Sequence, residues 1–325
     1  MAKSYVLEFP GWRADKRAIV DQYVMPQPTC VGACLFVVWS AIEKSQGNCD
    51  WSAIDARLAT WTAAGKQCAL IVWGISDAKP NVSTPGWVIA DPAYQSVTCS
   101  YYGNMPIPYA GAYPTYYRQF IQQLLAKYGS SSAIARIRFG WGVGGETYPP
   151  CYNNLKGHQP ADQFDQTWQN YVADGMTFAS AEPHTVLLDV ACNAYGNPPR
   201  LPVCDFIAKT ASGLTPPWCF GTQGLSQADI TAHAAGHPTN ADWLENFGHY
   251  RSSPTHLQTA TATDPTNAAG GTGSLNTLAP FALQHGCESF EVYLQDWQVA
   301  YDPAYATYAA YSAAYQAAFE QIAAY

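Results

Sequence analysis

The chain has 325 residues, of which 48% are hydrophobic and 12% charged, so it can bury a large core and is unlike a disordered chain. A net charge of −8 with only 16 Lys and Arg residues argues against nucleic acid or an anionic membrane as partner. No run approaches the ~18 consecutive apolar residues that a transmembrane helix needs.

Eight short apolar segments rich in β-branched and aromatic residues are predicted as strands. In chain order they are residues 6–9, 34–39, 69–73, 134–139, 185–190, 218–222, 256–260 and 289–294. Helical periodicity fills most of the intervals between them. The alternation predicts an α/β fold, a single-domain (β/α)₈ TIM barrel over residues 1–325.

Four predicted helices have visible boundaries. Ser52 and Asp55 suggest a capping box for a helix that Gly65 ends. Two more helices are expected at 113–127 and 163–180, and a last one is expected to open at Asp302-Pro303. In that last helix an aromatic stripe at helical spacing indicates packing; it comprises Tyr308, Tyr311, Tyr315 and Phe319.

Long loops rich in Pro, Gly and Asn follow the third, fourth, fifth and seventh predicted strands. They cover residues 75–112, 147–161, 193–206 and 261–275. These loops leave the carboxyl ends of the strands, which is the face where barrel active sites lie.

Ten cysteines form neither a CxxC pair nor a zinc-spaced cluster with histidine, so no metal is expected. Their even number and scattered positions favour disulfides over buried free thiols, and therefore an oxidising compartment. The first residues, MAKSYVLEF, lack the layout of a signal peptide. We expect a secreted or periplasmic protein whose signal peptide is absent from this chain, and no cofactor.

The stretch RFGWGVGGETYPP, residues 138–150, permits two interpretations. Gly140, Gly142 and Gly145 match a dinucleotide fingerprint, but that motif must open a helix, whereas here two prolines follow. We reject it. The alternative is a strand that ends beside a catalytic Glu146, where the glycines leave space for a ligand and apolar walls such as Trp141 raise the glutamate pKa.

A second carboxylate is less clearly marked. In SFEVYLQDW, Glu291 and Tyr293 are expected to point into the barrel, whereas Asp296 follows at the strand exit. We favour Glu291 as partner of Glu146, with Asp296 in reserve; the alternative role for Glu291 is a buried ion pair with Arg138.

Further polar and aromatic residues at predicted strand ends suit sugar binding. Asp189 and Asn193 are expected to support the catalytic carboxylates or bind sugar hydroxyls. The amides Gln223 and Gln258 are expected to bind sugar hydroxyls, and a structural bridge is the alternative for each. The candidates for stacking on sugar rings are Trp39, Trp73, Trp141 and Trp297. Core packing is the alternative for several of these rings.

Residues 34–72, CLFVVWSAIEKSQGNCDWSAIDARLATWTAAGKQCALIV, with STPGWV at 83–88, resemble the N-terminal half of glycoside hydrolase clan A barrels, most closely the β-galactosidase-like members. Cys49 stands where those members usually have tyrosine. The resemblance implies an acid/base glutamate after strand four, which Glu146 matches, although Gly145 replaces the usual asparagine. It also implies a nucleophilic glutamate ending strand seven, and HLQTATATDP contains none.

Two functions follow from these observations. The first is a metal-independent glycoside hydrolase that cleaves a neutral oligo- or polysaccharide with two carboxylates, with retention of configuration favoured over inversion. The second is a non-catalytic carbohydrate-binding barrel that has lost its nucleophile.

Overall fold

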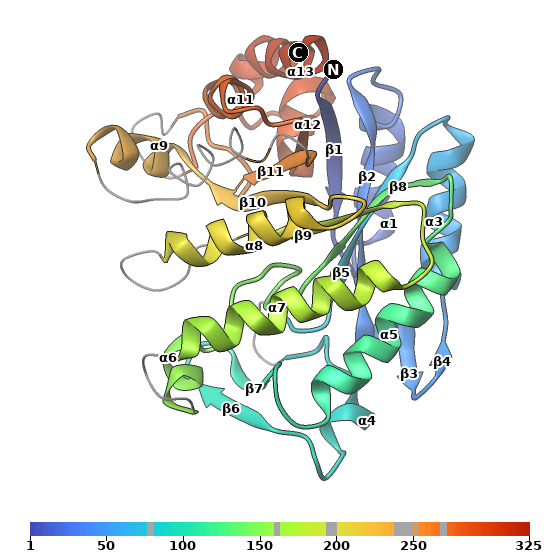
Figure 1. Cartoon of the computed structure of the whole chain (residues 1–325). Coiled ribbons are helices and arrows are strands. Elements are labelled where there is room, and N and C mark those ends of the chain that lie inside the picture. The colour runs from blue at the N-terminus through green and yellow to red at the C-terminus, as the bar shows by residue number, and fades with distance from the viewer. Residues whose placement is uncertain are drawn as a thin grey trace. The chain divides into compact units, whose positions relative to one another are not determined.

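The computed structural model describes residues 1–76, 81–158, 163–192, 200–236, 250, 253–259, 261–266 and 272–325. Eight parallel strands form a closed barrel in the order β1-β12-β11-β10-β9-β8-β5-β2 (Figure 1). Their bounds are Lys3–Glu8 (β1), Cys30–Val38 (β2), Cys68–Trp73 (β5), Ile134–Phe139 (β8), Leu187–Ala191 (β9), Cys219–Leu225 (β10), Thr255–Thr259 (β11) and Ser289–Val292 (β12). The predicted (β/α)₈ barrel and all eight of its strands are confirmed.

Helices follow the strands as the barrel fold requires. The longer ones are α1 (Ala14–Ile19), α3 (Ser52–Ala63), α5 (Tyr113–Tyr128), α7 (Phe164–Ala181), α8 (Leu201–Gly213), α9 (Gln227–Ala234), α11 (Leu275–Gln284), α12 (Leu294–Tyr301) and α13 (Ser312–Ala324). Short helical turns are η1 (Val20–Val24), α2 (Trp39–Ile42), α4 (Gly86–Ile89), α6 (Tyr152–Leu155), η2 (Lys156–His158) and η4 (Ala309–Tyr311).

Two β-hairpins lie in the loops that connect the barrel strands and helices. One consists of β3 (Glu43–Ser45) and β4 (Asn48–Cys49), and the other of β6 (Ser96–Cys99) and β7 (Gly103–Pro106). The second hairpin lies in the long loop expected after the third barrel strand, beside α6 (Figure 1). The Asn154 amide of α6 donates to the Thr98 carbonyl of β6 at 2.9 Å, which ties the two loops together.

The chain divides into two compact units. Unit 1 comprises Met1–Leu35, Leu58–Ala69 and Cys219–Tyr325, and unit 2 comprises Phe36–Arg57 and Leu70–Trp218. In unit 1, the Trp297 ring of α12 stacks on Phe319 of α13 with centroids 3.8 Å apart. In unit 2, helices α5 and α7 bury aromatic rings, including Phe120 and Trp168.

The end of the chain differs from the expected helix. Asp302 does not open a helix; its carboxylate accepts hydrogen bonds from Ala304 N–H at 2.9 Å and from the Gln298 amide at 3.2 Å, just past α12. The last helix begins only at Ser312, and Tyr308 adopts a left-handed φ of 63°. The segment predicted as one helix is therefore a turn followed by α13, because the Asp302 side chain satisfies backbone and side-chain donors around the end of α12.

The expected capping box at the start of α3 does not form. The Ser52 N–H donates to the Asp50 carboxylate at 3.0 Å, two residues earlier than the predicted cap. Asp55 instead accepts the Tyr128 hydroxyl at 2.8 Å and pairs with Lys127 at 2.9 Å. A carboxylate that the pattern assigned to a local turn thus links α3 to α5.

Two loop and cysteine expectations also change. The loop predicted over 193–206 already contains the start of α8 at Leu201, and its residues 193–199 lie outside the described residues.

Of the ten cysteines, only Cys99 and Cys151 form a disulfide, and seven of the eight free thiols are buried. Core packing, the alternative considered for these residues, accounts for most of them.

Across the described residues, none of the helices combines the length and apolarity that crossing a bilayer requires.

The single disulfide gives a testable prediction. The bond closes a loop between positions 52 apart, so its loss is expected to lower stability by up to about 4 kcal/mol on the chain-entropy model. We expect Cys99→Ser to lower the melting temperature, and thiol titration of the denatured, unreduced protein to give eight thiols. Cys49→Ser is the control, because it removes a half-buried free thiol. Equal melting of oxidised and reduced protein would contradict the assignment.

Candidate active site

Beyond the end of β8 the chain forms a short hairpin, residues 140–148, which we call the glycine hairpin. Its first arm runs beside the end of β5. The Gly140 N–H donates to the Val72 carbonyl at 3.1 Å, and the Gly144 N–H donates to the Ile75 carbonyl at 3.0 Å. The hairpin therefore extends β8 alongside the end of β5, at the carboxyl ends of the strands, where barrel active sites lie.

The tip of the hairpin is Gly144-Gly145, whose φ angles of 66° and 81° favour glycine. The chain then returns antiparallel to its first arm, and the Gly142 N–H donates to the Glu146 carbonyl at 2.7 Å. The Glu146 N–H in turn donates to the Val143 carbonyl at 3.1 Å. Glu146, which is half-buried, thus stands on the returning arm with its backbone held by two hydrogen bonds.

The glycines are needed for close backbone packing and do not leave room for a sugar ring as predicted. A Cβ on Gly142 would lie 2.1 Å from the Tyr148 carbonyl oxygen, and one on Gly140 would lie 2.5 Å from the Gly145 Cα. A Cβ on Gly145 would lie 2.9 Å from the Trp73 indole nitrogen. A side chain at position 145 would therefore force the Trp73 ring to shift, so this packing favours glycine.

Aromatic side chains flank the hairpin. Trp73, at the end of β5, is half-buried, and its ring meets Phe36 edge-on with centroids 4.9 Å apart. Its buried indole N–H has no hydrogen-bond partner among the described residues. On the returning arm, burial and the neighbouring Glu146 charge raise the pKa of the Tyr148 phenol. Tyr148 is therefore close enough to Glu146 for the two side chains to interact electrostatically.

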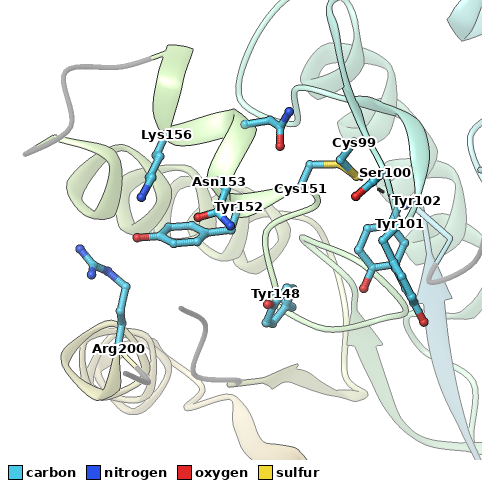
Figure 2. A pocket seen from close by; sticks show the side chains of 11 residues that line it. Cys99, Ser100, Tyr101, Tyr102, Tyr148, Cys151, Tyr152, Asn153, Lys156 and Arg200 are labelled. Atoms are coloured by element: carbon cyan, nitrogen blue, oxygen red, sulfur yellow. Dashed lines mark hydrogen bonds between the residues drawn. A yellow bond between two sulfur atoms is a disulfide. The ribbon is translucent and has the colours of Figure 1, made fainter. Parts of the chain in front are cut away.

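A pocket of about 640 Å³ begins at Tyr148, two residues along the chain from Glu146. The turn of the β6–β7 hairpin, the loop from Tyr148 to Lys156, and Arg200 line it (Figure 2). The Cys99–Cys151 disulfide joins the first two of these segments. Four tyrosines contribute to the lining, so the pocket offers both ring surface and hydroxyl groups; they are Tyr101, Tyr102, Tyr148 and Tyr152.

The second predicted carboxylate, Glu291, lies in the wall of the barrel in unit 1. It is 1% exposed, and the strand register pairs it with Tyr5 of β1 and Gln258 of β11. Gln258 pairs in turn with Gln223 of β10, whose amide donates to the Gln258 oxygen at 2.8 Å. Three residues predicted separately thus form one polar row, in which each amide already has a partner.

Asp189 is fully buried in β9 and accepts a hydrogen bond from Arg136 Nε at 3.0 Å. Arg136, which the sequence analysis did not select, lies two residues before Arg138 on β8, and Arg138 is the register partner of Asp189. An arginine-paired carboxylate inside the barrel fits a supporting role better than that of a proton donor. Asn193 lies outside the described residues.

Three of the four tryptophans proposed for stacking are enclosed by protein. Trp39 is 0% exposed, donates to the Glu43 carboxylate at 2.6 Å and stacks on Phe120. Trp141 is 1% exposed, and Gly175 of α7 packs so closely that a Cβ there would lie 2.4 Å from its ring. Trp297 is the ring stacked on Phe319 in unit 1. Trp73 alone of the four presents a half-exposed ring.

Asp296 lies just past the end of β12, in the first turn of α12, and it is fully buried there. Its Oδ1 accepts the Thr263 N–H at 2.9 Å and the Thr263 hydroxyl at 2.6 Å. That hydroxyl also shares a hydrogen bond with Tyr315 at 2.6 Å. Burial raises the pKa of the Asp296 carboxyl to about 7, against the Thr263 hydrogen bonds, which lower it.

Tyr293, just before α12, is half-buried with its ring 5.5 Å from that of Phe9.

The residues that line the pocket are not among those predicted from the sequence. Their signal was present as clustered tyrosines in the loops after strands three and four, in SYYG and ETYPPCYNN. What could not be inferred was that a disulfide draws these two loops together.

No protein-family model matches the chain, and no curated protein matches it in sequence. Among solved structures, it is similar to the crystal structure of the catalytic domain of β-amylase from Paenibacillus polymyxa, with a TM-score of 0.63 and 12% sequence identity. The match covers 90% of this chain and 91% of that chain. The likeness supports the resemblance to glycosidase barrels at the level of the fold, and the β-galactosidase-like subgroup stays a prediction.

The packing of the glycine hairpin predicts the effect of Gly142→Ala. The added methyl group would overlap the Tyr148 carbonyl, so the returning arm must shift, at a cost of about 1–3 kcal/mol. We expect a lower melting temperature. Gly213→Ala is the matched control, since nothing lies within 4 Å of its Cβ position. If both variants melt like the parent, the hairpin is not packed as described.

Asp296 predicts a pH dependence of stability. Its folded pKa of about 7 lies above the ~3.9 of an unfolded aspartate, so its contribution is complete below about pH 4 and is lost as pH rises through 7. We expect Asp296→Asn to remove a slope of at most about 1.4 kcal/mol per pH unit between pH 5 and 7. Urea unfolding at several pH values measures it, and parallel curves for parent and variant would contradict the assignment.

Proposed function

We propose that the protein is a glycoside hydrolase in which Glu146 is the general acid/base. The observation that carries this proposal is the placement of Glu146. It is half-buried, stands on a hydrogen-bonded hairpin at the carboxyl end of β8, and lies two residues along the chain from Tyr148 of the tyrosine-lined pocket. Cleavage of a glycosidic bond requires a proton donor held beside the leaving oxygen, and tyrosine and tryptophan rings are suited to hold sugars.

Trp73 supports the same role. Its indole N–H is a buried donor without a partner among the described residues, and the close packing of Gly145 fixes the ring beside the hairpin. The nitrogen itself is closed to solvent, so the contact with substrate would be made by the exposed part of the ring. In this proposal Trp73 binds substrate beside Glu146.

For the second carboxylate we propose Glu291, as nucleophile or as base. Its neighbours in the strand register, Tyr5 and Gln258, carry groups that can orient a carboxylate. Asp296 stays in reserve; it is fully buried, and its Oδ1 accepts hydrogen bonds from Thr263. Retention is expected if the two glutamate carboxyl groups are ~5–5.5 Å apart, and inversion if they are ~6.5–9.5 Å apart.

The remaining parts of the proposal are the partner and the compartment. The barrel likeness to a β-amylase catalytic domain supports an oligo- or polysaccharide as substrate. The Cys99–Cys151 disulfide supports an oxidising compartment, and hence a secreted or periplasmic protein. No residue is proposed here to bind a metal or cofactor.

Glu146→Gln tests the proposal. Removal of a general acid/base typically costs 10²–10⁴-fold, so kcat on the best substrate is expected to fall by that factor, and the pH–rate profile to lose one limb. The substrate is found by screening chromogenic glycosides and polysaccharides for released reducing sugar.

Glu182→Gln is the matched control. This half-buried glutamate at the end of α7 accepts a hydrogen bond from the exposed Gln122 amide, and its backbone carbonyl bonds to the His184 ring. The variant should keep full activity. Undiminished turnover by Glu146→Gln would overturn the role of Glu146. Sugar binding without turnover by the parent on every substrate would indicate the non-catalytic carbohydrate-binding barrel instead.

A further inference from the structure

The tyrosine-lined pocket has a cationic end. Tyr152 lies between two positive groups, with Lys156 Nζ 5.4 Å and the Arg200 guanidinium carbon 5.8 Å from its ring centroid. Figure 2 shows Lys156 above the Tyr152 ring and Arg200 below it, across the pocket from Tyr101 and Tyr102. Both cations line the pocket, and its described lining contains no aspartate or glutamate.

The two cations are held differently. Arg200 Nε donates to both oxygens of Asp165, at 2.8 and 2.7 Å, which fixes the side chain at the edge of the pocket. Lys156 is exposed, and among the described residues it has no carboxylate within ion-pair distance. Asp165 offsets the charge of Arg200, whereas among the described residues no carboxylate offsets that of Lys156, so the Lys156 end of the pocket is positively charged in a chain whose net charge is −8.

This arrangement is unusual for a site that takes only neutral sugars. An ammonium group without a counter-ion, next to an aromatic pocket, attracts an anion as a point charge, and a neighbouring guanidinium can add directed hydrogen bonds. The other end of the pocket offers tyrosine rings and the Ser100 hydroxyl, which suit a pyranose and its hydroxyl groups. Ring surface at one end and positive charge at the other match a sugar that carries an acidic group.

We propose that this pocket binds an acidic sugar residue of the substrate, one that carries a carboxylate or a sulfate ester, with its anionic group at Lys156 and Arg200. The inference rests on the proposed function for the position of the cleaved bond: the pocket starts at Tyr148, so the acidic residue would lie next to the sugar that Glu146 protonates. It refines the expectation of a neutral substrate to one in which at least one residue is charged.

The binding test uses the full chain carrying Glu146→Gln, so that substrate is not consumed. Calorimetric titrations with trigalacturonate, a sulfated galactose trisaccharide and neutral galactotriose compare the two anionic groups with a matched uncharged sugar. We expect one anionic sugar to bind at least tenfold more tightly than galactotriose, with an affinity that falls as NaCl rises from 50 to 500 mM. Which of the two binds identifies the acidic group.

Lys156→Met in the same background keeps the aliphatic stem and removes the charge. The anionic sugar should lose about tenfold or more in affinity, while galactotriose changes less than twofold. Lys209→Met, an exposed lysine on α8 away from the pocket lining, is the control and should change neither affinity. Equal affinity for all three sugars, or equal losses for charged and neutral sugars, would overturn the proposal.

The two proposals fail separately. Charge-selective binding that depends on Lys156, in a protein that hydrolyses nothing, would leave the pocket assignment standing and remove the glycosidase. Hydrolysis of neutral sugars by the parent with no effect of Lys156→Met on any affinity would leave the glycosidase standing and remove the acidic-sugar pocket.

Discussion

The candidate site depends on how closely the backbone of the glycine hairpin packs against itself and against Trp73. A Cβ on Gly142 would lie 2.1 Å from the Tyr148 carbonyl oxygen, and one on Gly145 would lie 2.6 Å from the Ile71 side chain and 2.9 Å from the Trp73 indole nitrogen. The two arms pack closely, and the backbone at Glu146 is held by hydrogen bonds with Gly142 and Val143. A catalytic acid benefits from such support, since a small displacement of the proton donor lowers the rate.

The same hairpin links the barrel to the pocket in which we propose that substrate binds. Beyond Glu146 the chain passes through Tyr148 to the cysteine bonded to Cys99, and then to the short helix that carries Tyr152 and Lys156. Protonation and recognition of the substrate are therefore assigned to consecutive parts of one loop. The disulfide joins this loop to the β6–β7 hairpin, which forms the opposite pocket wall, so we expect its loss to alter the pocket as well as the stability.

The sequence predicts the strands well because buried parallel strands are continuous apolar runs, and β8 coincides with its predicted segment at both ends. Glu146 is correctly expected just past the end of β8 for the same reason, since its position follows from that strand end. The errors concern partners that are distant in sequence: Asp55 bonds to α5, Asp296 to Thr263, and Trp39 to Phe120. Gly140, Gly142 and Gly145 were identified as important, but whether a glycine makes room for a ligand or for the chain itself depends on atoms that a local pattern does not contain.

The most direct test of the account is a crystal structure of the Glu146→Gln protein with an oligosaccharide substrate bound. The account predicts a glycosidic oxygen within about 2.6–3.2 Å of the side chain at position 146, and sugar residues continuing into the pocket lined by Tyr148 and Tyr152. The distance from that oxygen's anomeric carbon to Glu291 would also identify or exclude the second carboxylate. An oligosaccharide bound elsewhere on the barrel, with position 146 untouched, would contradict the central claim.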